Sequence, residues 1–228
     1  MKRASPALVV CDLAGTIIHD RGEVPAAFAD ALREAAVPFD PEDLHAWRGA
    51  SKRDVLGRLL APDGAPDESV RRRLDAVNDR FRLLLQTRLA RADPLTIDGV
   101  GEALARLRAN GMRVAITTGF DRQLVQTILA AVAWAPLVDA VVTSEDVPAG
   151  RPAPYMIFRA MEQCGIHDVR QVAVVGDTRL DLEAAWNAGA TWRLGVLTGA
   201  HDRRTLEAAP ATQVLPAITD VPSLWIDG

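Results

Sequence analysis

Carboxylate, hydroxyl and basic side chains gather in four short stretches of this 228-residue chain. They are DLAGT (12–16), TTG (117–119), GRPAP (150–154) and GDTRLD (176–181). Acids that share one crevice repel one another and are costly to bury unless a cation is present. Mg²⁺ binds oxygen ligands and keeps sites for a substrate phosphate, so we predict Mg²⁺ as the cofactor. A phosphoryl group held there could be attacked by the ionised Asp12 to form an aspartyl-phosphate.

These stretches need a scaffold that brings them together. Apolar runs predict strands at 7–11, 112–117, 138–143 and 172–176, with a fifth at 192–197. Helical spacing appears between them, as over 100–107, where Asn110-Gly111 follows as a helix end. Strands that alternate with helices predict an α/β fold with a doubly wound, Rossmann-like parallel sheet. The reactive stretches then follow strand ends on one edge of the sheet, where such folds bind ligands.

One part of the chain breaks this alternation. Residues 19–92 contain no strand-like run, whereas apolar residues at 70, 74, 77, 81 and 84 predict one long helix. PDGAPD (62–67) reads as a turn between helices. We therefore expect an inserted all-helical cap domain over 19–92, and a core domain formed by 1–18 and 93–228. Its joints would lie near 19–22 and 92–94.

The composition narrows the classes of partner. A formal net charge of −4 gives no reason to expect nucleic acid or an anionic membrane as partner. No run approaches 18 apolar residues, and the two cysteines are far apart, which is typical of a cytoplasmic protein with reduced thiols. A monomer and a homodimer both stay open. The expected partner is a small phosphorylated or phosphonylated metabolite.

The order DLAGT, ITTG, GRP and GDTRLD, with a helical insertion after the first motif, resembles the haloacid dehalogenase superfamily of phosphohydrolases. The resemblance implies that Asp12 is the nucleophile and a metal ligand. It implies further Mg²⁺ ligands at the Ala14 carbonyl and Asp177, with Asp181 as a water-mediated ligand or supporting acid. The groups expected to hold the phosphoryl group or the substrate are Thr118, Gly119, Gly15 and Thr16, with Arg151 standing where relatives carry a lysine.

Position 14 departs from most phosphatases of that superfamily. They carry an aspartate two residues after the nucleophile, which protonates the leaving oxygen, and Ala14 cannot do this. One interpretation is a slow phosphatase whose leaving group needs no acid. The other is that the leaving group is not an alkoxide.

The phosphonoacetaldehyde hydrolase branch, whose members cleave a C–P bond, also carries alanine at this place. A cap lysine there forms a Schiff base with the substrate aldehyde. The sequence RGASKRDVL (48–56) offers Lys52, the sole lysine besides Lys2, and Arg48 and Gly49 of the same loop would contact the substrate. The departures that stand against full identity include Val55, which replaces the histidine of that branch, and Phe120, which replaces its tyrosine.

Three hypotheses therefore remain. The preferred one is hydrolysis of a phosphonate aldehyde, with Asp12 as nucleophile and Lys52 as imine former. The second is hydrolysis of a phosphate monoester of the phosphoglycolate or sugar-phosphate type, in which Lys52 is a basic residue near a helix start. The third is a metabolite-binding module without catalysis.

Overall fold

The chain folds around one parallel sheet in the computed structural model, which describes residues 5–62, 64, 67–91 and 95–226. The sheet has six strands in the order β3-β2-β1-β4-β5-β6, and every neighbouring pair is parallel. The strands are β1 (Leu8–Asp12), β2 (Arg113–Thr118), β3 (Ala140–Thr143), β4 (Val172–Gly176), β5 (Trp192–Val196) and β6 (Gln213–Leu215). The predicted doubly wound α/β class is confirmed.

The five predicted strands are present, with ends shifted by up to two residues. The sixth strand, β6, was not predicted. It has only three residues at the edge of the sheet, and Gln213 is exposed, so it lacks the continuous apolar run that marks a strand buried on both faces.

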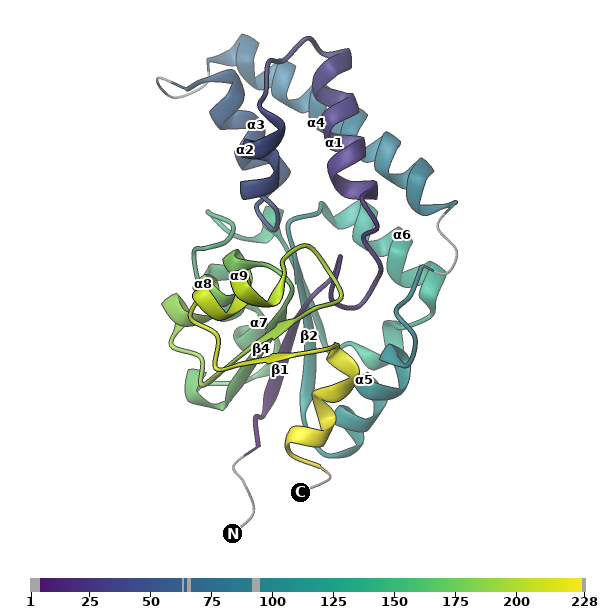
Figure 1. Cartoon of the computed structure of the whole chain (residues 1–228), viewed down its shortest axis with the longest axis vertical. Coiled ribbons are helices and arrows are strands. Elements are labelled where there is room, and N and C mark those ends of the chain that lie inside the picture. Colours follow the sequence, from purple (N-terminus) through teal and green to yellow (C-terminus); the bar gives the residue numbers. More distant parts are fainter. Residues whose placement is uncertain (1–4, 63, 65–66, 92–94, 227–228) are drawn as a thin grey trace.

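Helices cover both faces of the sheet (Figure 1). On one face α5 (Val100–Ala109) and α6 (Arg122–Val132) pack against one hydrophobic cluster, and on the other α7 (Tyr155–Cys164) and α8 (Arg179–Ala188) pack against a second. Successive β1 residues alternate between the clusters, with Val9 in the first and Val10 in the second. The last helix, α9 (Arg203–Ala208), packs beside β6.

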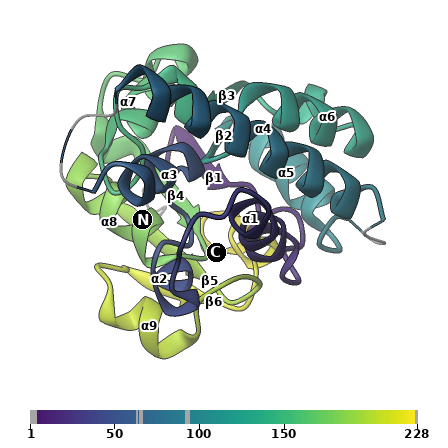
Figure 2. The ribbon, with the colours of Figure 1, turned by 90° about the horizontal axis from the view of Figure 1, so that it is seen from above.

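Among the described residues between β1 and α5, four helices form an insertion that lies over the carboxyl ends of the strands (Figure 2). They are α1 (Glu23–Glu34), α2 (Pro41–Ala46), α3 (Lys52–Leu60) and α4 (Glu68–Leu89). The long helix expected over 70–84 is confirmed as α4. Its buried face continues through Leu85 rather than through Leu84. The rings of Phe28 and Phe81 meet edge to face with centroids 5.4 Å apart, which ties α1 to α4.

The two connections to this helical insertion run side by side. Ile18 pairs with Thr96 in an antiparallel bridge, and the His19 amide donates to the Leu95 carbonyl at 2.9 Å. The domain limits 19–92 stay a prediction. The expected joint at 92–94 lies outside the described residues, as do three residues of the expected turn at 62–67.

A charged brace holds the start of β2 against the segment before β3. Asp139 accepts hydrogen bonds from the Val114 amide at 2.9 Å and from Arg113 at 2.8 Å, and it also pairs with Arg108. Burial raises the pKa of Asp139, but these hydrogen bonds and the arginine charges outweigh it, so the pKa is lowered overall.

Replacing this acid tests the brace. We expect Asp139→Asn to lower the free energy of unfolding at pH 7 by about 1–3 kcal/mol, the usual range for a lost charged hydrogen bond. Because the folded pKa lies below the unfolded one, the stabilisation is complete above about pH 4 and is lost as pH falls through the folded pKa. Urea denaturation at pH 7 and near pH 3 measures both, and a difference that is unchanged at the lower pH would contradict the assignment.

Within the described residues, no helix combines the length and the apolar character that crossing a lipid bilayer requires.

Candidate active site

Three carboxylates meet where the strand order reverses, between β1 and β4. Asp12 ends β1, Asp177 follows β4, and Asp181 lies in the first turn of α8. All three are buried, with 7%, 1% and 1% exposure, and each offers an oxygen within 4.8 Å of the others. The expectation that segments far apart in sequence bring these acids together is confirmed.

The start of α8 fixes the position of Asp181. Thr178 is the N-cap residue, and its amide and hydroxyl donate to the Asp181 carboxylate at 3.0 and 2.5 Å. Behind the acid, a Cβ added to Gly176 would come within 2.3 Å of the Asp181 Cβ. Only glycine at position 176 leaves room for this arrangement.

Arg151 inserts its guanidinium between two of the acids. Its Nη1 lies 2.7 Å from Asp12 Oδ1 and its Nε 2.9 Å from Asp181 Oδ1, while Nη2 donates to the Thr117 carbonyl and hydroxyl. Pro152 does not open a helix, because α7 begins at Tyr155. The Arg151-Pro152 peptide bond is cis.

Asp177 is held by Thr16, for which the sequence predicted another role, and by the loop at 199–200, for which it predicted none. Thr16 Oγ1 donates to its Oδ1 at 3.2 Å, and the Ala200 amide donates to its Oδ2 at 2.7 Å. A Cβ on Gly199 would lie 2.0 Å from Asp177 Oδ2. The sequence did contain a signal for this contact. Gly199 and Ala200 are two small residues in the loop after the fifth strand, at the same edge of the sheet as the acids.

The electrostatics of this cluster call for a further cation. Burial raises the pKa of Asp12 to about 7, Arg151 opposes this, and the charge of Asp181 adds to it. Burial, and then the charges of Asp12 and Asp181, raise the pKa of Asp177. Buried oxygen ligands with one arginine among them fit a hard divalent ion such as Mg²⁺, so the described residues could hold a metal here.

Of the groups expected to bind a phosphoryl oxygen, Thr118 and Gly119 line the cavity, whereas Gly15 and Thr16 do not. Thr118 and Gly119 line the cavity above Asp12, as does Ala14. Gly15 has a φ of +90°, and a Cβ there would come 2.4 Å from Asp177 Oδ2. Thr16 is fully buried and points to Asp177 rather than lining the cavity.

The loop at 47–51 of the helical insertion closes over these groups. Gly49 has a φ of +83°, and a Cβ there would lie 2.4 Å from Thr178 Oγ1. A Cβ on Gly119 would lie 3.0 Å from the Ala50 carbonyl. The insertion thus contacts the same turn that positions Asp181, and a side chain at either glycine would force the two parts of the chain apart.

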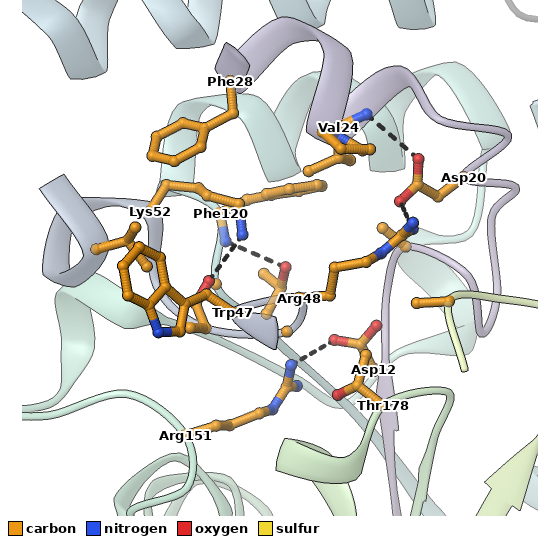
Figure 3. Close-up of a pocket in the computed structure, with 18 of the residues that line it drawn as sticks. Asp12, Asp20, Val24, Phe28, Trp47, Arg48, Lys52, Phe120, Arg151 and Thr178 are labelled. Atoms are coloured by element: carbon orange, nitrogen blue, oxygen red, sulfur yellow. Dashed lines mark hydrogen bonds and ion pairs between the residues drawn. The ribbon is translucent and has the colours of Figure 1, made fainter. Parts of the chain in front are cut away.

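Lys52, at the start of α3, reaches into the cavity (Figure 3). Its Nζ donates to the Ala50 carbonyl at 3.1 Å and lies 5.7 Å from the centre of the Phe28 ring. Burial lowers the pKa of Lys52 to about 8, and the charge of Arg48 adds to this effect, while Asp20 and Asp12 oppose it. A substantial fraction of the amine is therefore neutral near pH 8.

The sequence placed Asp20 only in the predicted joint and indicated no role for it in the site. In the structure its carboxylate connects groups at the opening of the cavity. Its Oδ1 accepts hydrogen bonds from the Gly22 and Val24 amides at 3.1 and 3.2 Å, at the start of α1. Its Oδ2 holds the Arg48 guanidinium at 2.5 Å (Figure 3). The acid thereby ties the joint to the 47–51 loop.

All these groups line or support one cavity of about 670 Å³, counted with the space open to solvent. Among its lining residues are Asp12, Ala14, Arg48, Gly49, Lys52, Thr118, Gly119, Arg151 and Asp177. Asp181, Gly15 and Thr16 stand behind this lining and support it. The roles predicted for individual residues stay predictions.

The close approach of Gly199 to Asp177 gives a direct test of the metal site. We expect Gly199→Ala to displace the Asp177 carboxylate and to weaken Mn²⁺ binding by about 10–100-fold, the usual effect of disturbing a supporting group. Isothermal titration of the ion, used as a Mg²⁺ substitute, measures this. Gly64→Ala is the control, because a Cβ there meets nothing within 4 Å. Equal affinities for the two variants would contradict the assignment.

Comparison with known proteins agrees with this geometry. A family model described as haloacid dehalogenase-like hydrolase matches residues 6–189. Phosphonoacetaldehyde hydrolase of Paraburkholderia xenovorans is 30% identical, covering 82% of this chain and 73% of the relative. The enzyme of the same name from Bacteroides fragilis is 31% identical, covering 93% of this chain and 86% of the relative.

Solved structures share the fold along nearly the whole chain. A phosphonoacetaldehyde hydrolase-like protein from Oleispira antarctica superposes with a TM-score of 0.80 at 22% identity, covering 100% of this chain and 94% of the other. A hydrolase from Pseudomonas syringae gives 0.79 at 23% identity, covering 94% and 95% of the two chains. Together with the matched family model and the buried acid cluster, these similarities show that the chain belongs to the haloacid dehalogenase-like hydrolases.

Proposed function

We propose that this protein is a Mg²⁺-dependent hydrolase that cleaves the C–P bond of a phosphonate bearing an aldehyde or ketone group. The observation that carries the proposal is that the Lys52 amine and the Asp12 carboxylate line one cavity, while Ala14 beside them offers no acid. An amine in the substrate cavity supplies what a carbon leaving group needs. An acid that protonates a leaving oxygen has no use in that reaction.

The reaction begins at the carbonyl group. The neutral Lys52 amine adds to the carbonyl carbon, water leaves, and the resulting imine takes up a proton from solvent to become the protonated imine. Lysine can do this because its amine can lose a proton, which an arginine cannot. The pKa of about 8 makes the neutral amine available under mildly alkaline conditions.

The phosphoryl transfer follows. A carboxylate oxygen of Asp12 attacks phosphorus, the C–P bond breaks, and its electron pair moves into the imine to give an enamine. Water then hydrolyses the aspartyl-phosphate to inorganic phosphate. Protonation of the enamine carbon and addition of water to the imine release the carbonyl product and regenerate Lys52.

The surrounding groups hold the phosphonyl oxygens during this transfer. Arg151 contributes positive charge beside Asp12, and Thr118 and Gly119 lie at the cavity wall where their polar groups can contact the oxygens. Asp12, Asp177, the Ala14 carbonyl and Asp181 would hold the Mg²⁺ ion. When bound, the ion would offset the negative charge of the phosphonyl group and the acids.

The relatives support this choice over a phosphate ester. Those compared above carry the name phosphonoacetaldehyde hydrolase at 30–31% identity over most of the chain. The 47–51 loop closing over the acids would exclude bulk water from the imine and the acyl phosphate.

Chemical trapping tests the imine. Borohydride added with phosphonoacetaldehyde should inactivate the enzyme irreversibly and leave a reduced adduct on Lys52, located by peptide mass spectrometry. Lys52→Arg keeps the positive charge but cannot form the adduct. Its kcat should fall by about three orders of magnitude or more, as when a covalent catalyst is removed. No adduct, together with full activity of the arginine variant, would refute the imine.

The pH dependence follows from the same amine. Lysine reacts in its neutral form, so kcat/KM should rise with pH through about 8 and then level off. A pH profile measured with saturating Mg²⁺ checks this. A profile that is flat between pH 7 and 9 would contradict the role of Lys52.

A substitution at position 14 distinguishes C–P bond cleavage from phosphate monoester hydrolysis. Ala14→Asp introduces a carboxyl group at the cavity wall, and we expect phosphate monoester turnover to rise by about 10²–10⁴-fold, the range of general acid catalysis. C–P cleavage should gain nothing. If the unmodified protein already hydrolyses monoesters faster than phosphonates, and Lys52→Arg keeps that activity, the monoester function is correct instead.

A further inference from the structure

The half of the cavity away from Asp12 has an apolar wall. Two side chains come from α1, one each from α2 and α3, one follows α2, and one follows β2 (Figure 3). They are Val24, Phe28, Leu44, Trp47, Val55 and Phe120. Phe28 and Val55 are each 2% exposed. Packing against the rest of the protein fixes these side chains, so the wall is a preformed surface for an apolar group.

Apart from Lys52, which the proposed imine would occupy, the charged groups near this wall are paired with each other. Asp20 is anchored by two backbone amides and holds Arg48 at 2.5 Å, with the two side chains 5% and 19% exposed. A second anionic group on the substrate could recruit Arg48 only by leaving Asp20 buried without its cation, which is strongly unfavourable. The wall therefore disfavours a carboxylate on the organic part of the substrate.

Lys52 stands between the two halves of the cavity. Its Nζ lies 5.7 Å from the centre of the Phe28 ring, which belongs to the apolar half. The other half contains Asp12 and Arg151. A carbonyl carbon bonded to Lys52, with the phosphonyl group at Asp12, directs its remaining substituent towards Phe28 and its neighbours. In an aldehyde that substituent is a hydrogen atom, which leaves the wall uncovered.

We propose that the organic part of the substrate carries an uncharged apolar substituent beyond the carbonyl, as in a 2-oxoalkylphosphonate with a chain of several carbons or an aryl group. The placement of the carbonyl rests on the function proposed above. The apolar preference is a property of the wall and can be measured without any reaction. The six wall residues together determine this specificity.

Unreactive ligands test the wall alone. Methyl-, propyl- and pentylphosphonate are titrated into the Mg²⁺-loaded protein by calorimetry. Each methylene that leaves water should lower Kd by about fourfold until the wall is covered. 3-Carboxypropylphosphonate, of similar length, should bind more weakly than pentylphosphonate. Affinities that do not change with chain length, or tighter binding of the carboxylate, would overturn the proposal.

Substitutions test whether the wall residues cause the dependence of affinity on chain length. Leu44→Asp places a charge in the wall and should remove the gain from propyl- to pentylphosphonate while methylphosphonate still binds. Val24→Phe fills the wall and should shorten the chain at which the gain ends. Leu83→Asp is the control, because Leu83 is 53% exposed on α4 and does not line the cavity. If this control changes the chain-length dependence as much as Leu44→Asp, the wall is not its source.

The reactive series separates this proposal from the proposed function. 2-Oxopropyl- and 2-oxopentylphosphonate are compared with phosphonoacetaldehyde for phosphate release and for borohydride adducts on Lys52. Adducts with a kcat/KM for 2-oxopentylphosphonate no higher than for 2-oxopropylphosphonate, two ketones of similar reactivity, would overturn the apolar preference and leave C–P cleavage standing. Chain-length-dependent binding without any adduct would support the apolar wall and refute the imine.

Discussion

The burial of several like charges at the junction of β1 and β4 is the constraint on which the site depends. Asp12, Asp177 and Asp181 each have an oxygen within 4.8 Å of the others, and burial with mutual repulsion raises the pKa of the first two. Such an arrangement is stable only if donors and cations surround it. Arg151, the Ala200 amide and the Thr178 hydroxyl supply part of that requirement.

The rest of the fold places these donors around the three acids. The parallel sheet brings the ends of β1, β2 and β4 to one edge, and the first turn of α8 adds Asp181 through its capping Thr178. A Cβ at position 15, 176 or 199 would clash with Asp177 or Asp181, so glycine at these positions leaves the space that the acids occupy. The helical insertion then rests on the same turn through Gly49, so that the substrate-facing loop and the acid cluster are positioned by one contact.

Much of this arrangement could be predicted from the sequence, because buried parallel strands leave continuous apolar runs and the acids follow them directly. What could not be predicted depends on folding in three dimensions. Ala200 acts through its backbone amide, which no residue type reveals. Asp20 matters because its two oxygens face different segments, Val24 on α1 and Arg48 on the loop. The short edge strand β6 lacks an apolar run. Helix α7 begins only after Pro154, because the preceding residues form a turn in which the Ala153 amide donates to the Gly150 carbonyl.

The paired connections at Ile18 and Thr96 have a mechanical consequence. A body tethered by two adjacent, hydrogen-bonded segments can swing about them far more easily than it can slide or twist away. Such a swing would carry Arg48 and Lys52 together with Asp20, because Arg48 is paired with Asp20 and Lys52 contacts the Ala50 carbonyl and the Phe28 ring within the insertion, whereas Asp12 would remain with the sheet. Access for solvent and the distance between the Lys52 amine and the Asp12 carboxylate would therefore change together, so that one movement would both close the cavity to water and bring the two groups into place.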